Sequence, residues 1–216
     1  MYIPEKTLSQ IDTVSARERR HVAILDAAET LFLEQGYDRT SLADIVRRSG
    51  GSLATLYDLF GNKQGLLRAI ATRWSDETAF RPLEPAATAA TSHVGILRNY
   101  AYQQSDAMQS PRAIALMRML VSESVRDRDF AVRIYRDLHL PAIDELVELF
   151  TGWAEAGEAA IDHPEAAAKL FLNIVFGDAM LNALAGIEEE WPDRAEIDWR
   201  LRPFISHFKI GDASLT

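Results

Sequence analysis

The chain has 216 residues, of which 48% are apolar and 25% are charged, and its formal net charge is −9. These proportions are typical of a folded globular protein and exclude a largely disordered chain. The absence of cysteine excludes disulfide bonds, a thiolate nucleophile and a zinc site with cysteine ligands. An acidic total also argues, taken alone, against a nucleic-acid-binding protein.

The charge is divided unevenly along the chain. Residues 1–70 hold nine basic and nine acidic side chains, whereas residues 71–216 hold 14 and 23. The acidic excess therefore lies in the second part, which indicates two regions with different roles. The first thirty residues lack the apolar core of a signal peptide, and polar residues interrupt the most apolar stretch, 170–181. We expect a cytoplasmic protein without a membrane association.

The N-terminal region predicts an arm followed by a helix. Residues 1–14 show no periodicity and predict a flexible arm. Ser15 and Glu18 form a capping-box pattern, and Gly36 ends the segment that follows. Between them, apolar residues recur at helical spacing: Ile24, Leu25, Ala28, Leu31 and Phe32.

Two short helices and a longer one follow. Helices are predicted over residues 41–49 and 52–60, and Gly50-Gly51 forms the turn between them. Two short helices around a glycine-containing turn fit a helix-turn-helix, although the same pattern also occurs as plain structure. A connecting helix is predicted over 63–80. We therefore expect a three-helix DNA-binding domain over residues 15–62.

The remaining chain reads as a larger helical domain over residues 63–216. Residues 83–92 and the acidic run 188–190 are expected to be loops, and Pro141 is expected to kink a long helix. The predicted helices span 93–108, 112–124, 128–156, 164–185 and 193–209. Because alternating β-branched segments bounded by turn pairs are missing, the predicted fold class is all-α.

The start of the helix over 52–60 has the residue types that a DNA-reading helix needs. Ser52, Ala54 and Thr55 are small, so the backbone can approach DNA closely. The hydroxyl groups of Ser52 and Thr55 can bond phosphate oxygens or base edges, and the N–H groups at a helix start attract phosphate.

The residues around this turn resemble a known family. Thr40-Ser41-Leu42-Ala43-Asp44-Ile45, followed by Ser49-Gly50-Gly51-Ser52-Leu53-Ala54-Thr55-Leu56-Tyr57-Asp58-Leu59-Phe60-Gly61-Asn62-Lys63, is similar to the DNA-binding signature of the TetR/AcrR transcriptional regulators. The upstream segment from Ile24 to Tyr37 matches it as well, so the resemblance covers about residues 17–70. Phe176-Gly177-Asp178 is similar to the AefR-like subgroup.

The resemblance implies roles for individual residues. Thr40, Ser41 and Lys63 would contact phosphate, and Tyr57 would reach the backbone or a base edge. The complete implied DNA-binding set is Thr40, Ser41, Arg47, Ser52, Leu53, Ala54, Thr55, Tyr57 and Lys63. Four positions depart from the family pattern: Gly51, Leu53, Asp58 and Leu59. Asp58 would repel phosphate unless it pairs with Arg47 or Arg48.

The second domain carries two further candidate sites. Large apolar residues and one acid are candidates for an effector pocket: Trp74, Tyr100, Met117, Tyr135, Trp153, Phe176 and Asp178. Residues of the last two helices are candidates for a four-helix bundle with a twofold mate, which the resemblance also implies: Phe171, Val175, Gly177, Leu181, Phe204 and Phe208. For each of these residues, a place in the ordinary core is the competing interpretation.

The predicted function is therefore sequence-specific DNA binding by a transcriptional regulator. We expect a homodimeric repressor that binds a roughly palindromic operator in double-stranded DNA and is released by a small apolar or aromatic effector. No cofactor and no metal site are expected. The alternative is a helical interaction module that has kept the fold but lost DNA binding. An enzyme is disfavoured because the sequence has no P-loop, nucleophile-elbow, zincin or dinucleotide-binding motif.

Overall fold

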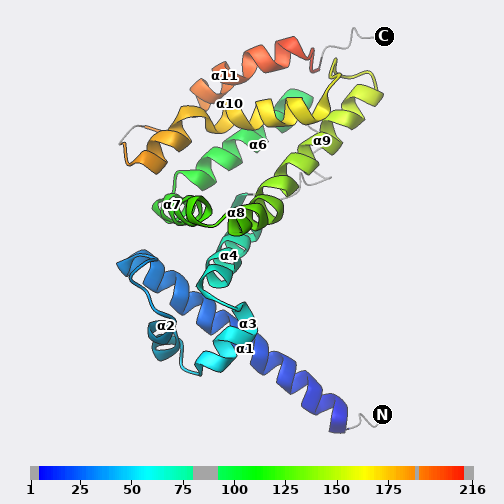
Figure 1. The fold of residues 1–216 in the computed structure, drawn as a ribbon. Coiled ribbons are helices and arrows are strands. Elements are labelled where there is room, and N and C mark those ends of the chain that lie inside the picture. The colour runs from blue at the N-terminus through cyan, green and yellow to red at the C-terminus, as the bar shows by residue number, and fades with distance from the viewer. Residues whose placement is uncertain (1–4, 80–91, 188–189, 212–216) are drawn as a thin grey trace. The chain divides into compact units, whose positions relative to one another are not determined.

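The computed structural model describes residues 5–79, 92–187 and 190–211, and the regular elements of these ranges are all helical (Figure 1). The prediction of an all-α protein is confirmed. Most of the loop expected over 83–92 and most of the acidic run 188–190 lie outside the described residues. The chain divides into two compact units, residues 1–71 and 72–216. This division falls within a helix, later than the predicted boundary at residue 62.

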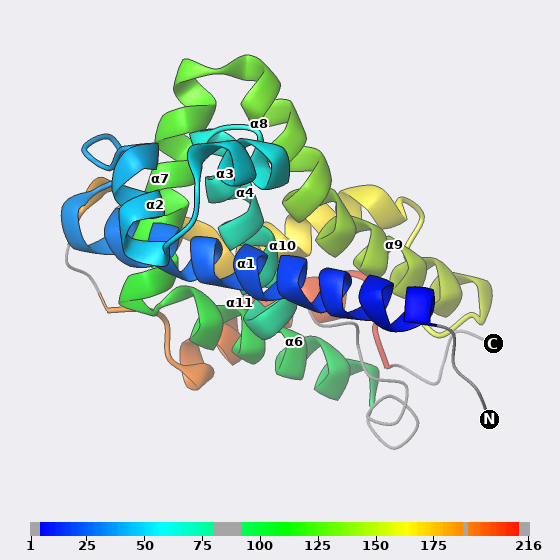
Figure 2. The ribbon, with the colours of Figure 1, turned by 90° about the horizontal axis from the view of Figure 1, so that it is seen from below.

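The first unit consists of three helices and most of a fourth. They are α1 (Glu5–Gln35), α2 (Leu42–Ser49), α3 (Leu53–Phe60) and α4 (Lys63–Trp74). Helix α2 packs against α1, and α3 packs against α2 (Figure 2). Most of the apolar stripe predicted on the first helix lies in the core, and its remaining member, Leu31, is half-buried. The core of this unit comprises Ile24, Leu25, Ala28, Phe32, Ile45, Leu56, Leu66, Leu67 and Ile70.

The beginning of the chain differs from the prediction. Residues 1–14 were expected to be a flexible arm, and Ser15 was expected to begin the first helix. Instead, α1 begins at Glu5 and runs without interruption to Gln35. No glycine or proline lies between these two residues, so nothing in the covalent chemistry stops the helix near Ser15. The lack of an apolar stripe over residues 5–14 hid this extension.

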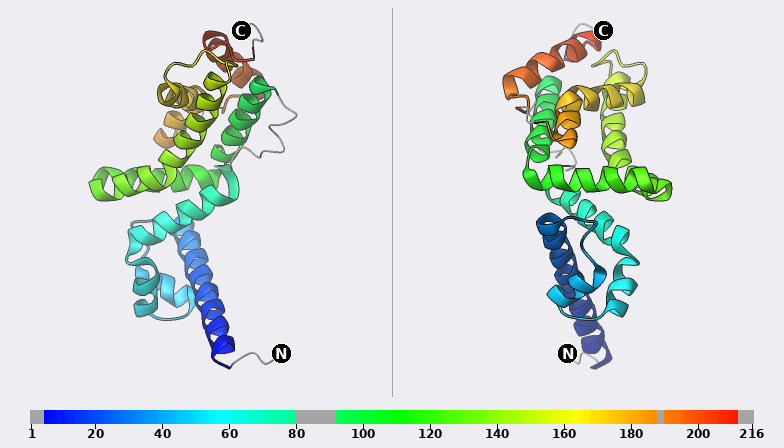
Figure 3. Two further views of the ribbon diagram at one scale, coloured as in Figure 1. Left: turned by 90° about the vertical axis from the view of Figure 1, so that its right-hand side faces the viewer. Right: turned by 60° about the vertical axis from the view of Figure 1, so that its left-hand side comes forward.

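The second unit is a larger set of packed helices. Its elements are η1 (Ser75–Ala79), α6 (His93–Met108), α7 (Pro111–Arg126), α8 (Arg128–Ile134), η2 (Tyr135–His139), α9 (Leu140–Glu155), α10 (Pro164–Ala185) and α11 (Arg194–His207). Helix α10 packs against α9, α11 and α6 (Figure 3). Phe150, Phe171 and Phe204 meet at the centre of the core with ring centroids 5.6–6.3 Å apart.

Two helices of this unit are interrupted. The kink predicted at Pro141 takes the form of a π-helical segment, η2, which ends two residues before the proline. A wider turn of this kind relieves the clash between a proline ring and the preceding turn. In α10, Gly177 has φ 42° and ψ −138°, which are not helical values. Arg200 of α11 donates to Asp178 Oδ1 at 3.2 Å and to Glu196 beside this kink.

Helix α10 is the one described helix that is long and apolar enough, by length and composition, to cross a membrane. In the sequence, polar residues interrupt the apolar stretch 170–181 of this helix, and the length and composition of the whole helix were not predicted. Its inward side nevertheless packs into the core through Phe171, Leu172 and Val175, each at most 5% exposed. Core helices of globular proteins pass the same test of length and composition.

Candidate nucleic-acid interface

Helix α2 begins with a complete capping box. Ser41 Oγ accepts a hydrogen bond from the Asp44 N–H at 3.1 Å, and Asp44 Oδ2 accepts one from the Ser41 N–H at 3.2 Å. Arg47 adds an ion pair to the same carboxylate at 2.5 Å. The hydrogen bonds from Ser41 and then from Arg47 lower the pKa of Asp44. Ser41 and Arg47 remain exposed, so both can still face a phosphate while this network holds them in place.

The turn between α2 and α3 depends on two glycines and one arginine. Gly50 and Gly51 have φ of 69° and 118°, in the region that favours glycine. The Arg20 guanidinium donates to the carbonyl oxygens of Ser49 and Gly50 at 3.2 and 2.6 Å. A Cβ on Gly51 would lie 3.3 Å from Arg20 Nη1. Gly51, which departs from the family pattern, thus makes room for an arginine that organises the turn.

Helix α3 presents an exposed face beyond its cap. Ser52 Oγ accepts from the Thr55 N–H at 3.1 Å and closes the start of the helix. Thr55 is half-buried, and Leu56 is fully buried. Three of the residues predicted to touch DNA from this helix lie on its exposed side: Leu53 is 42% exposed, Tyr57 is 52% exposed, and Ala54 is exposed as well. A DNA contact by the half-buried Thr55 stays a prediction. A helix anchored on one side and open on the other has the geometry of a recognition helix.

Asp58 does not pair as predicted. Its carboxylate lies 3.8 Å from the Arg17 guanidinium of α1, with both side chains largely exposed. Arg47 pairs with Asp44, and Arg48 makes a two-point ion pair with Glu34 at 2.7 and 3.3 Å. The prediction that Arg47 or Arg48 neutralises Asp58 is therefore wrong, because nearer acids hold both arginines.

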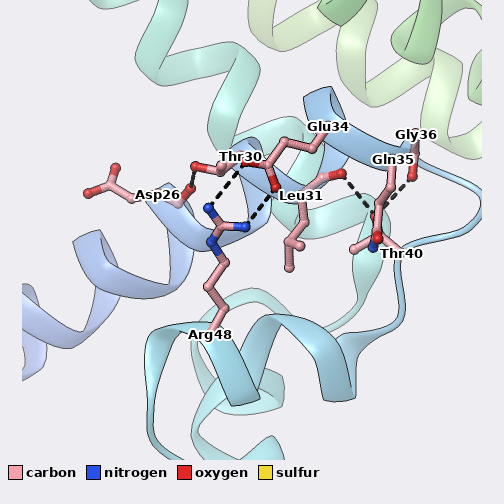
Figure 4. Close-up of polar contacts among 8 residues, drawn as sticks. All are labelled: Asp26, Thr30, Leu31, Glu34, Gln35, Gly36, Thr40 and Arg48. Atoms are coloured by element: carbon pink, nitrogen blue, oxygen red, sulfur yellow. Dashed lines mark hydrogen bonds and ion pairs between the residues drawn. The ribbon is translucent and has the colours of Figure 1, made fainter.

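The Thr40 side chain is buried and makes hydrogen bonds inside the first unit. It is 2% exposed, and its hydroxyl group donates to the carbonyl oxygens of Gly36 at 2.9 Å and Leu31 at 3.3 Å (Figure 4). The same oxygen accepts a hydrogen bond from Gln35 Nε2 at 3.2 Å. The structure contradicts a phosphate contact by this hydroxyl, because the group is buried and already makes hydrogen bonds within the first unit.

Lys63 lies at the start of α4 and is half-buried. Its Nζ sits 4.3 Å from the centroid of the Tyr37 ring and donates to the Asp38 carbonyl oxygen at 3.3 Å. The cation–π contact and the hydrogen bond fix the direction of the ammonium group. A phosphate contact by Lys63 would add to these interactions and stays a prediction.

Two family models match the chain. The N-terminal model of the bacterial regulatory proteins of the tetR family matches residues 24–70, which include the helix-turn-helix. The model of the AefR-like transcriptional repressor C-terminal domain matches residues 95–208, more than half of the chain. This protein belongs to the TetR family of transcriptional regulators. Both the family and the AefR-like subgroup agree with the resemblance seen in the sequence.

Curated transcriptional regulators match parts of the chain. The chain is 49% identical over 57 residues to the transcriptional repressor ComR of Escherichia coli K12. This match covers 26% of this chain and 27% of ComR. It is 28% identical over 149 residues to the repressor KstR2 of Rhodococcus jostii RHA1, covering 68% and 69% of the two chains. The match to ComR thus spans about a quarter of that relative's length.

Solved TetR-family structures match nearly the whole chain. A TetR-family regulator from Mesorhizobium loti superposes with a TM-score of 0.74 at 20% identity, covering 89% of this chain and 98% of the other. The flavonoid-responsive regulator FrrA superposes with a TM-score of 0.71 at 27% identity, covering 88% and 97%. The fold of both units of this TetR-family protein is therefore that of complete family members.

The structure separates the residues predicted to line an effector pocket. Trp74, Tyr100 and Trp153 are buried, Met117 and Phe176 are half-buried, and Tyr135 is 46% exposed. Asp178 is exposed and pairs with Arg200. Tyr135 and Asp178 therefore lie at the surface and the other members lie in or beside the core, so that an effector pocket lined by this set stays a prediction.

Some residues of the predicted dimer interface are buried in the core and others are exposed. Phe171, Val175, Phe204 and Phe208 are at most 8% exposed and fill the core of their own chain, so their assignment to a partner surface is wrong. Leu181 is 67% exposed and keeps its predicted role open, and Gly177 is exposed as well. Sequence periodicity missed other large exposed side chains on and beside the last two helices: Leu170, Ile187 and Trp199.

An open cleft of about 630 Å³ lies between the ends of α6, α7 and α10. Its lining comprises Gln109, Ile114, Arg118, Ala183, Gly186, Ile187, Glu190 and Trp191, none of which the sequence singled out as an effector contact. Arg118 is fixed there because its Nε donates to the Ala183 carbonyl oxygen at 3.1 Å. Among the described residues no group of three or more histidine and acidic side chains is arranged to hold a metal ion.

Proposed function

We propose that this TetR-family protein is a transcriptional repressor that binds operator DNA through α3 and is released by a small apolar or aromatic effector. The exposed face of α3 carries the proposal. Ser52 caps the helix, Leu56 anchors it, and Leu53 and Tyr57 project from the opposite side. Such a helix can enter the major groove while Ser41 and Arg47 meet the adjacent phosphates.

The charge distribution of the first unit shapes this proposal. Most of its described arginines are held by acids or carbonyl oxygens of the same unit, as with Arg20, Arg47 and Arg48. Few cations are then left to attract DNA of any sequence. We expect weak non-specific binding and an affinity that depends on the docking of two half-sites.

A homodimer is part of the same proposal. Leu181 on α10 and Trp199 on α11 are 67% and 65% exposed, and the two helices pack side by side. Two such helices from each chain can form a four-helix bundle across a twofold axis. The two recognition helices should then read half-sites about one turn of DNA apart, near ~34–36 Å.

An aromatic effector is supported by the chemistry of the second unit, whose core is rich in aromatic rings. The related regulator FrrA is named for its response to flavonoids, which are aromatic molecules. We extend only this broad class to the present protein.

Selection of bound sequences from random DNA tests the proposal. We expect an enriched, roughly palindromic sequence that the purified protein retards in a gel shift. If no sequence is enriched at low salt, the proposal fails and the alternative of an interaction module without DNA binding takes its place.

A further inference from the structure

The C-terminal end of α2 is closed in a different way from those of α3, α7 and α10. In those three helices, the residue after the helix donates its N–H to a carbonyl oxygen of the last turn, as Gly61 does to Tyr57 at 2.8 Å. Gly50, which follows α2, has φ 69° and ψ 153° and donates no such bond within the described part of the chain. The last carbonyl groups of a helix need partners, so those of α2 require a donor from elsewhere.

Arg20 of α1 supplies this donor. Its Nη1 carries two N–H groups, and it donates to the carbonyl oxygens of Ser49 at 3.2 Å and Gly50 at 2.6 Å. Ser49 is the last residue of α2, where the negative end of the helix dipole favours a cation. Gly51 lies directly against the guanidinium, since a Cβ there would be 3.3 Å from Nη1 and 3.5 Å from Cζ. Arg20 therefore fixes both the end of α2 and the path of the chain through the turn.

The same part of α1 also contacts the far end of α3. The Arg17 guanidinium lies 3.8 Å from the Asp58 carboxylate, and the ring centroids of His21 and Phe60 are 4.6 Å apart. Positions 17, 20 and 21 share one face of α1, because residues three and four apart are neighbours on a helix. Arg20 makes the strongest of these contacts, since hydrogen bonds from a charged donor are stronger than an exposed ion pair. One face of α1 thus holds α3 at both ends.

We propose that Arg20 is a positioning residue for operator recognition, which sets the angle at which α3 leaves the turn and so the fit of Leu53 and Tyr57 to base edges. This inference rests on the proposed function, because it concerns the same recognition helix. Both N–H groups of Arg20 Nη1 are used on the turn, so the residue acts through the backbone of the turn. A phosphate contact by Arg20 predicts a different result, because it would weaken the binding of all DNA sequences alike.

Arg20→Met removes the guanidinium and keeps a side chain of similar length. Arg48→Met is the matched control, because Arg48 also joins α2 to α1 and carries the same charge, but its partner is the Glu34 carboxylate and not the turn. Fluorescence titrations of the full-length proteins give the affinity for a selected sequence and for random DNA. We expect the ratio of these affinities to fall about five- to a hundredfold in Arg20→Met, as for one mismatched base pair, and to stay within about twofold of wild type in Arg48→Met.

Arg20→Lys decides the question if Arg20→Met does not fold. Lysine keeps the charge but lacks the planar, forked donor group of arginine. We expect Arg20→Lys to bind random DNA as wild type does and to bind the selected sequence more weakly. Urea denaturation followed by circular dichroism shows which variants are folded under the conditions of the titration.

Two results overturn the inference and leave the proposed function intact. In the first, the folded Arg20 variant keeps the wild-type ratio of affinities for selected and random DNA. In the second, Arg20→Met weakens the binding of both DNAs equally, which would make Arg20 a phosphate contact. Wild-type protein that does not prefer the selected sequence over random DNA overturns both the inference and the proposed function.

Discussion

The replacement of Thr40 by valine tests whether this residue holds the fold or touches DNA. Valine has nearly the same shape and lacks the hydroxyl, which lies 2.9 Å from Gly36 O and 3.2 Å from Gln35 Nε2 in a site that is 2% exposed. Each net hydrogen bond contributes about 1 kcal/mol, and a buried group left unsatisfied costs more. We expect Thr40→Val to lower the free energy of unfolding by about 1.5–3 kcal/mol.

Thr30→Val is the matched control for this experiment. The Thr30 hydroxyl also donates to a carbonyl oxygen, that of Asp26 at 2.7 Å, but this is a half-exposed bond within one helix (Figure 4). Its loss should cost less than about 0.5 kcal/mol. Urea denaturation followed by circular dichroism measures both values, and hydrogen exchange at the α2 amides locates the effect. Equal stability of the two variants, with weaker DNA binding by Thr40→Val alone, would refute a structural role for Thr40.

Three further predictions concern the second unit and the pH response. Gly177→Ala should lower the free energy of unfolding by about 1–3 kcal/mol, because φ 42° and ψ −138° suit only glycine. Gly152→Ala in α9, where a Cβ would meet open space, should raise it by about 0.5–1 kcal/mol. If calorimetric melting shows Gly177→Ala to be the more stable of the two variants, the kink at Gly177 is contradicted. Leu181→Glu should convert the dimer into monomers in sedimentation. Val125 on α7 is 83% exposed, and Val125→Glu, the control, should leave the dimer intact. A dimer that survives Leu181→Glu would exclude the surface around Leu181 as the dimer interface. The lowered pKa of Asp44 means that its ionised form stabilises the fold above the reference value of 3.8, and that this contribution is lost as the pH falls through the lowered value. Asp44→Asn should therefore lose less stability on acidification than wild type, and identical acid denaturation profiles would exclude the effect.

Local patterns in the sequence predicted most helices well. The predicted helices over residues 93–108 and 164–185 have the same bounds in the structure. The helices predicted over 41–49 and 52–60 start at the two serines that cap α2 and α3, Ser41 and Ser52, because a cap depends on neighbours within one helical turn. The start of α1 was missed because residues 5–14 show no apolar periodicity at helical spacing.

Contacts between distant residues could not be predicted in the same way. Arg20 reaches the turn across about thirty positions of sequence, and Arg17 rather than a nearer arginine meets Asp58. Apolar periodicity identified Phe171 and Phe204 as inward-facing, but it cannot distinguish the core of a chain from the interface of a dimer. Hydroxyl groups such as that of Thr40 pose the same problem, because residue type does not reveal whether internal acceptors already occupy them.

The central claim is that the exposed face of α3 reads operator DNA. Titration of a selected, fluorescently labelled DNA with wild type, Tyr57→Ala and Tyr135→Ala tests it directly, since the two tyrosines are 52% and 46% exposed in different units. We expect Tyr57→Ala to weaken specific binding by about tenfold or more and Tyr135→Ala to leave it unchanged. Equal affinities for the selected DNA in all three proteins would contradict the claim.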